Sequence, residues 1–128
     1  MKYSFIKQVD LSYEDALDKV TQELQKEGFG VLTEIDVKAT LKKKLDVDYN
    51  KYKILGACNP PLAHQALTAD PQIGLLLPCN VVVYESDEGN TVVAAIDAKA
   101  MMSVVQRDEV NTIAEQVNNK LKSVIENV

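Results

Sequence analysis

The chain has few of the residue types that mark particular classes of protein. Tryptophan is absent and aromatic residues make up only 5% of the 128 residues, so the core must consist mainly of aliphatic side chains. There are two cysteines and one histidine, too few for a disulfide scaffold or a histidine-rich metal centre. The glycine-rich motifs of dinucleotide-binding proteins and P-loop proteins are missing, as is the nucleophile elbow of α/β-hydrolases. The sequence therefore lacks the motifs by which dinucleotide-binding proteins, P-loop proteins and α/β-hydrolases are usually identified.

Long hydrophobic runs are also missing. The longest apolar stretch, residues 73–84, contains Asn80 and is too short to span a bilayer. Lys7, Gln8 and Asp10 interrupt the N-terminal segment, which therefore does not read as a signal peptide. We expect a cytoplasmic protein with reduced thiols and no membrane partner.

The charge balance argues against nucleic acid as a partner. The net charge is −5 and the isoelectric point is about 4.8, a sign that repels phosphate backbones and anionic membranes. The basic run Lys42–Lys44 could contact phosphate, but Asp46 and Asp48 follow it closely. Three lysines on a short helix more often form a solvated face.

Hydrophobic periodicity predicts one α+β domain spanning residues 1–128. The final hairpin and a long terminal helix favour a mainly antiparallel sheet with helices on one face. In the strand at 29–37, alternation places Val31, Thr33 and Ile35 on one face. The predicted strands cover residues 3–9, 29–37, 52–57, 75–84 and 91–96, and the predicted helices 13–27, 37–45, 60–70 and 106–128.

Local signals define several of these boundaries. Ser12 precedes an acidic residue by three positions, as in a capping box, and predicts the start of the first helix. Gly28 supplies its left-handed stop. Pro60 and Pro61 end the third strand and can open the helix that follows. The sequence 86–90, Ser-Asp-Glu-Gly-Asn, predicts the turn of the hairpin.

The residues with the strongest site chemistry are concentrated between Tyr52 and Glu85. This segment holds both cysteines, the histidine and all four prolines. Cys58, His64 and Cys79 are of the types that bind zinc or another transition metal, and three protein ligands would leave an open coordination position. Cys58 could alternatively act as a nucleophile with His64 as its base. Against both ideas, free cysteine is commonly a small buried apolar residue, and the Cys58–His64 spacing is not a known ligand motif.

Two asparagines and one aspartate complete the candidate site. Asn59 and Asn80 each follow a cysteine, and Asp97 follows the last predicted strand. Their polar side chains could hold a ligand in a cleft. Asparagine also commonly caps helices and satisfies loop backbone, and that structural use is the alternative for both amides.

The motifs YKILGACNPPLA and IGLLLPCNVVVYE, at residues 52–63 and 73–85, resemble those of the domain-of-unknown-function 302 family. The resemblance extends through Asp97 and Met101 and covers nearly the whole chain. One departure is Ala98, where family members often carry proline. The resemblance implies a TATA-box-binding-protein-like α+β fold, in which a curved antiparallel sheet grips a long helix. It also implies a homodimer, and it implies no established activity.

Together these observations predict a homodimeric, non-catalytic protein that binds a small ligand or serves as an accessory domain. Its site is expected near the sheet edge that carries the two cysteines. The alternative is a thiol- or metal-dependent enzyme using Cys58, His64 and Cys79. A third possibility makes the apolar run Leu75–Leu77 a dimer interface. The candidate ligand-binding residues are Cys58, Asn59, His64, Cys79, Asn80 and Asp97.

Overall fold

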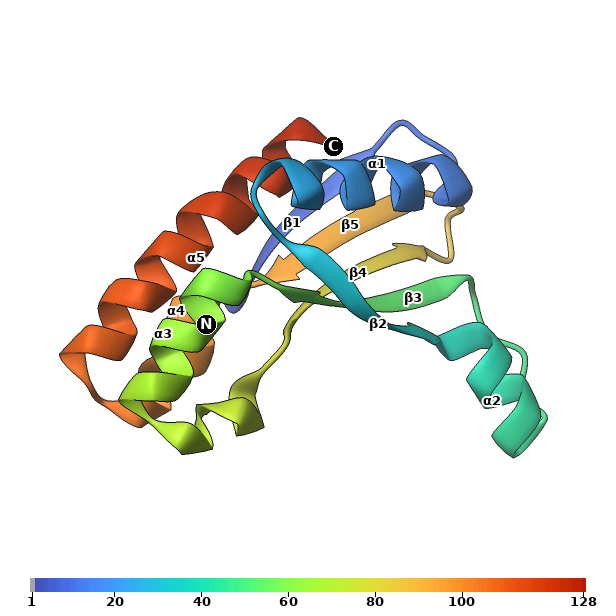
Figure 1. Ribbon diagram of the computed structural model, residues 1–128. Helices are drawn as coiled ribbons and strands as arrows, with labels where there is room; N and C mark the ends of the chain where they lie inside the picture. Colours follow the sequence, from blue (N-terminus) through green and yellow to red (C-terminus); the bar gives the residue numbers. More distant parts are fainter. Residues whose placement is uncertain (1) are drawn as a thin grey trace.

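The computed structural model describes residues 2–128, whose strands form one five-stranded sheet with the order β1-β5-β4-β3-β2 (Figure 1). All neighbouring strands are antiparallel. The predicted α+β class with an antiparallel sheet is therefore confirmed. The strands are β1 (Ser4–Val9), β2 (Gly30–Asp36), β3 (Tyr52–Cys58), β4 (Cys79–Glu85) and β5 (Thr91–Ile96).

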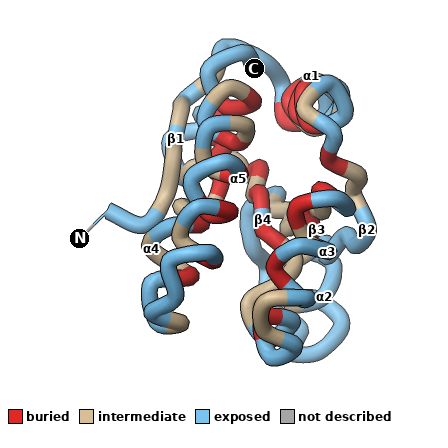
Figure 2. The backbone as a smooth tube through the Cα atoms, turned by 60° about the vertical axis from the view of Figure 1, so that its left-hand side comes forward, coloured by how far each residue is buried: buried red, intermediate tan, exposed pale blue. Residues whose placement is uncertain are grey.

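Two long helices, α1 and α5, cover one face of this sheet (Figures 1 and 2). The shorter helix α3 packs beside α5, whereas α2 extends from the ends of β2 and β3. Within residues 2–128, every helix is too short or too polar to span a bilayer. The helices are α1 (Tyr13–Lys26), α2 (Val37–Leu45), α3 (Pro60–Ala69), α4 (Ala98–Met102) and α5 (Asp108–Asn127), with short 3-10 turns η1 (Pro71–Leu76) and η2 (Ser103–Val105).

The core lies between the covered face of the sheet and the two long helices. Alternate residues of the central strands point toward the helices and are buried, and one stripe of each helix meets them. Figure 2 shows these buried positions on the side of α5 that faces the sheet. Each fully buried aliphatic side chain contributes about 1.5–3 kcal/mol. The central members are Leu55, Val81, Val83, Val93, Val20, Leu24, Val110, Val117 and Leu121.

The helix boundaries follow the local signals in the sequence. The Ser12 hydroxyl accepts a hydrogen bond from the backbone N–H of Asp15 at 3.1 Å, which confirms the predicted N-cap of α1. Gly28 has a φ of +84°, the left-handed conformation expected at the end of this helix. Pro60 occupies the first turn of α3, where its missing N–H is tolerated.

The prediction of a strand from Leu75 to Tyr84 is wrong in its first part. Residues 71–76 instead form η1, whose start is capped by the Asp70 carboxylate. Pro78 has no N–H to donate to a sheet ladder, and β4 begins only at Cys79. The run Leu75–Leu77 is apolar, as a buried strand would be, and this similarity led to the wrong prediction. Pro78 prevents the strand from extending back into this run.

Strand β2 also departs from the predicted alternation. A register shift between Val31 and Thr33 places an irregularity at Leu32. Val31 lies opposite the buried Ala57, whereas Thr33 lies opposite Gly56 on the other face of the sheet. Val31 therefore does not share a face with Thr33, since one additional residue reverses the side-chain alternation.

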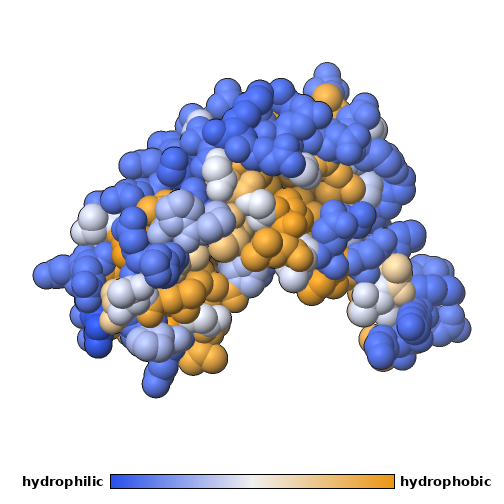
Figure 3. Space-filling view, in the orientation of Figure 1, coloured by the Kyte–Doolittle hydropathy of each residue, from blue (hydrophilic) through white to orange (hydrophobic). Residues whose placement is uncertain are grey.

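The face of the sheet opposite α1 and α5 is open and largely apolar. We call it the open face. Its side chains form cross-strand pairs, among them Val82 with Ala94, Ile54 with Val82, and Ile35 with Ile54. No helix crosses the side of β3 and β4 away from α1 and α5 in Figure 1, and the space-filling surface is hollowed there, between η1 and α2 (Figure 3). An uncovered apolar sheet face of this kind is a candidate for an interaction surface.

One glycine permits the close packing of β2, β3 and the segment before β4. A Cβ atom at Gly56 would collide with the Thr33 hydroxyl and lie 2.8 Å from the Pro78 ring carbon Cγ. Real Cβ contacts are longer, so either the side chains or the backbone would have to move. Glycine is thus needed at position 56 because the side chains of Thr33 and Pro78 leave no room for a Cβ atom. Its backbone angles do not themselves require glycine.

We expect Gly56→Ala to destabilise the protein by about 1–3 kcal/mol, the usual cost of adding a methyl group to a filled space. Urea unfolding followed by circular dichroism would measure the loss. Gly30→Ala is the matched control, because a Cβ at Gly30 meets no atom within 4 Å. Equal stability of the two variants would contradict this account.

Candidate functional site

The two cysteines lie at the same end of the sheet but on opposite faces. Strands β3 and β4 are antiparallel, and Cys79 lies directly opposite Ala57. Cys58 is one position further along β3, and side chains alternate between faces along a strand. The predicted proximity along the sheet edge is therefore present, but the two thiols do not converge on one side.

The environments of the two thiols differ. Cys79 is 4% exposed, and this burial, together with the nearby Cys58, raises the pKa of its thiol to about 11. A thiol of this kind is protonated and inert at neutral pH. Cys58 is half-buried and lies on the open face of the sheet.

His64 lies away from both cysteines, on the exposed side of α3. It lines a polar groove between α3 and α5, together with Thr68, Glu109 and Gln116. Residues 2–128 contain no group of three or more histidine, cysteine or acidic side chains placed to hold a metal ion. The arrangement thus offers neither a three-ligand metal cluster nor a base positioned beside Cys58.

Asn59 has a structural task that occupies both ends of its amide. The residue is 8% exposed. Its Oδ1 accepts a hydrogen bond from the Leu62 N–H at 3.3 Å and caps α3, while its Nδ2 donates to the Glu27 carbonyl at 3.2 Å. The Asn59 side chain therefore ties the start of α3 to the end of α1.

Asp97 caps α4 and holds it against α5. Its Oδ1 accepts hydrogen bonds from the Ala100 N–H at 3.0 Å and from Asn118 Nδ2 at 2.8 Å, and Asn118 Oδ1 accepts from the Ala98 N–H at 2.7 Å. Burial works against ionisation of Asp97. The hydrogen bonds to the carboxylate outweigh this effect of burial and hold the pKa of Asp97 below its usual value. The positive charge of Lys99 makes a smaller contribution in the same direction.

Asn80 is the candidate residue whose amide faces solvent from the open face. It is exposed and lines a shallow pocket of about 240 Å³, together with Tyr3, Ile6, Tyr52 and Tyr84. We call this the open-face pocket. A single amide among apolar and aromatic side chains is the composition expected of a small-molecule site.

Tyrosines dominate the surroundings of this pocket. The rings of Tyr52 and Tyr84 stack at a centroid distance of 5.1 Å, and Tyr49 adds a tilted contact with Tyr52 at 6.4 Å. Burial raises the pKa of Tyr52, with smaller contributions from Tyr84, Tyr49 and Tyr3. The tyrosines present ring faces and hydroxyl groups to this side of the sheet.

The basic run on α2 has local acidic partners. Lys42 Nζ lies 2.9 Å from Asp46 Oδ1 and 3.5 Å from Asp48 Oδ1. These ion pairs neutralise part of the basic run. They fit the expectation that Lys42–Lys44 form a solvated helix face.

The tyrosines of the open-face pocket were not among the residues predicted from the sequence. They come from the N-terminal segment, from β3 and from β4, so no motif joins them. A usable signal was present in residues 81–84, Val-Val-Val-Tyr, which carry no polar position on either face. A strand that is apolar on both faces requires a cover on each side.

The sheet is thus covered by helices on one face only and carries a small aromatic pocket on the other, in an antiparallel α+β architecture. Residues 5–128 match the family described as Domain of unknown function DUF302. The chain belongs to this family, as its two motifs predicted.

A solved structure has the same fold. It is described as the uncharacterized conserved protein DUF302 from Bacillus stearothermophilus, with 24% sequence identity and a TM-score of 0.92. The match covers 99% of this chain and 98% of that chain. No curated protein matches the chain. The comparisons therefore fix the family and the fold and assign no activity.

We expect Asn59→Ala to lower stability by about 1–3 kcal/mol, because it removes a helix cap and leaves the Glu27 carbonyl without its amide donor. Thermal unfolding would measure the change. Asn80→Ala is the matched control, since it removes the same amide from an exposed position after the other cysteine. A stable Asn59→Ala protein would rule out the proposed junction between α1 and α3.

Cys79 should resist thiol reagents in the folded protein. In a Cys58→Ser variant at pH 8, we expect no reaction with a chromogenic disulfide reagent until denaturant is added, when one thiol becomes reactive. The reason is that both burial and the raised pKa keep Cys79 out of its thiolate form. Rapid native reaction of this variant would contradict the assigned burial.

Proposed function

We propose that this chain is a single-domain, homodimeric, non-catalytic protein that binds a small ligand in the open-face pocket. The observation that carries the proposal is the exposed amide of Asn80 among the aromatic side chains of an otherwise apolar, uncovered sheet face. An amide both donates and accepts hydrogen bonds, so it can orient the polar edge of a ligand. The tyrosine rings supply apolar contact.

The dispersal of the thiols and the histidine supports a binding role over catalysis. Cys79 points into the core, Cys58 faces the other way, and His64 lies on α3. Of the residues predicted from the sequence, the proposed site therefore keeps Asn80, whereas Cys58 lies on the same face of the sheet but outside the lining of the pocket. Both free thiols are compatible with the cytoplasm, where reducing conditions preserve them.

The size of the pocket limits the ligand. A volume of about 240 Å³ lies just below the range of roughly 300–1,000 Å³ common for drug-sized ligands. We therefore expect a small metabolite with a flat or apolar body and at least one hydrogen-bonding group. Acidic phosphate compounds are disfavoured by the net charge of −5.

Ligand binding should raise the melting temperature. A ligand at about one hundred times its dissociation constant stabilises the folded state by about 2.7 kcal/mol, which shifts the melting temperature of a domain of this size by several degrees. A panel of small metabolites tested by differential scanning fluorimetry would reveal it. We expect Asn80→Ala to abolish the shift while leaving the melting temperature of the free protein nearly unchanged.

Asn119→Ala serves as the matched control, because Asn119 is an exposed asparagine on α5. A hit that survives Asn80→Ala but not Asn119→Ala would place binding elsewhere. If no metabolite shifts the wild-type protein at millimolar concentration, the ligand-binding proposal fails. Light scattering across a concentration series tests the homodimer separately.

A further inference from the structure

The sheet has two edge strands, β1 and β2, and they differ in their protection against pairing. Strand β2 carries a bulge at Leu32 and the exposed charges Glu34 and Asp36. Bulges and charged side chains are the devices by which natural sheets block edge-to-edge contact. Strand β1 pairs with β5 in continuous register and has no bulge.

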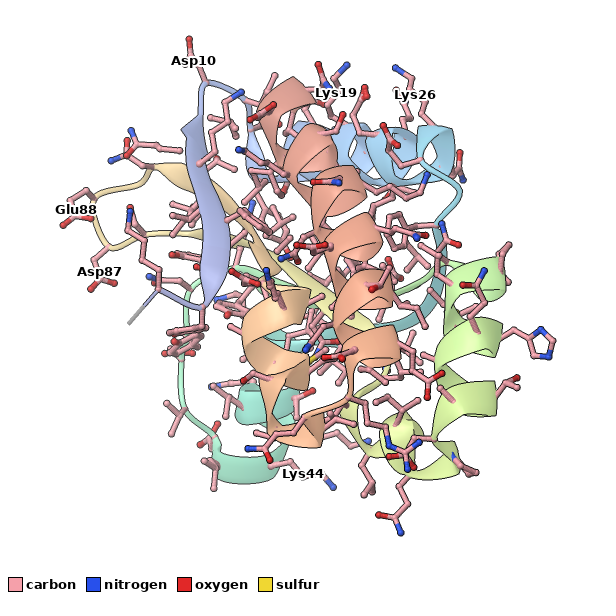
Figure 4. All side chains as sticks on the ribbon, turned by 90° about the vertical axis from the view of Figure 1, so that its left-hand side faces the viewer. Asp10, Lys19, Lys26, Lys44, Asp87 and Glu88 are labelled. Carbon is pink, nitrogen blue, oxygen red and sulfur yellow. The ribbon has the colours of Figure 1, made fainter. Side chains whose placement is uncertain are left out.

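The free edge of β1 presents hydrogen-bonding groups to solvent. The Tyr3 carbonyl accepts a hydrogen bond from the Asp97 N–H at 2.8 Å, which sets the alternation of the antiparallel ladder. The N–H and C=O groups of Ser4, Ile6 and Gln8 consequently point away from β5. Among residues 2–128, no helix or loop lies across this edge in Figures 2 and 4.

The one charged side chain within β1 is turned away from the edge. Lys7 Nζ donates to the carbonyl oxygens of Glu126 at 3.1 Å and Val128 at 3.0 Å, at the end of α5. Its ammonium group therefore does not protrude to block an incoming strand. At the centre of β1 stands Ile6, a β-branched residue with 62% of its surface exposed.

Opposite charges flank the two ends of this strand. A groove of about 640 Å³ beside its first half is lined by the three lysines Lys2, Lys7 and Lys122, with Glu126 as the opposing charge. A groove of about 680 Å³ beside its second half is lined by three aspartates and by two lysines, Lys7 and Lys19. The aspartates are Asp10, Asp15 and Asp18, of which Asp10 extends beyond the end of β1 in Figure 4.

We propose that β1 pairs antiparallel with β1 of a second copy of this chain, about a twofold axis at Ile6. The proposal rests on the homodimer proposed above and specifies its interface. Antiparallel pairing brings the basic end of each strand to the acidic end of the other, with Lys2 opposite the partner's Asp10. A strand with one basic and one acidic end is complementary to itself in this orientation.

The resulting dimer has one continuous ten-stranded sheet. Ile6 lines the open-face pocket, so the partner's Ile6 lies at the border of the same pocket. The two open-face pockets are brought together across the axis and each gains an apolar wall. This addition brings a small pocket closer to the size of a typical ligand site.

A disulfide trap tests the axis. In a Cys58→Ser background, Ile6→Cys should form an intermolecular disulfide under mild oxidation, because paired residues at such an axis have Cα atoms about 5.5 Å apart. Ile35→Cys in the same background is the matched control, since Ile35 is a 48% exposed isoleucine on the opposite edge strand. Cross-linking of Ile35→Cys without Ile6→Cys would overturn the proposal.

Charge exchange tests the orientation. Lys2→Glu and Asp10→Lys should each weaken the homodimer roughly tenfold, because each replaces two attractive pairs across the axis with two repulsive ones. An equimolar mixture of the two variants should regain wild-type affinity, since both pairs are then attractive. Sedimentation velocity measures these affinities, and unchanged affinity of both single variants would overturn the proposed orientation.

The outcomes separate this interface from the homodimer itself. A wild-type dimer that neither cross-links at Ile6→Cys nor responds to charge exchange leaves the homodimer standing and refutes pairing through β1. A wild-type protein that is monomeric at all concentrations refutes both. Neither result affects the thermal-shift test of ligand binding through Asn80.

Discussion

The side-chain amide of Asn59 joins the parts of the fold that the sheet alone does not hold together. It lies directly after β3, caps α3, and holds the last turn of α1 through the Glu27 carbonyl. Gly28 leaves room for it, because a Cβ there would lie 3.2 Å from the Asn59 amide nitrogen. Because the amide is buried, removal of either hydrogen-bond partner would leave a polar atom unsatisfied. The resulting loss of stability would exceed the net contribution of the hydrogen bond itself. The start of α3 is thereby fixed relative to the end of α1.

Much of the family motif can be understood as architecture. Gly56 admits Thr33 and Pro78, Asn59 forms the junction, and Pro60 opens α3. In the second motif Cys79 fills the core. Asn80 differs from Asn59 in that its amide is exposed, on the apolar open face.

The sequence predicted the fold class and most elements, because caps, turns and helical periodicity are local signals. It failed where two local signals conflicted, as at Pro78, and where one residue at Leu32 reversed the alternation of a strand. The open-face pocket was beyond such reasoning. Tyr3, Tyr52 and Tyr84 meet only through strand order and register, which depend on long-range pairing that no local pattern encodes.

Helix α2 differs from the rest of the chain in the origin of its stability. None of its residues is buried, and its main packing contacts are with β2 and β3. Its order depends on the Asp36 cap at 2.9 Å and on ion pairs such as Lys42–Asp46, each worth only a fraction of a kcal/mol to about 1 kcal/mol. Local opening of α2 therefore costs less free energy than opening of the sheet, whose strands carry the buried core.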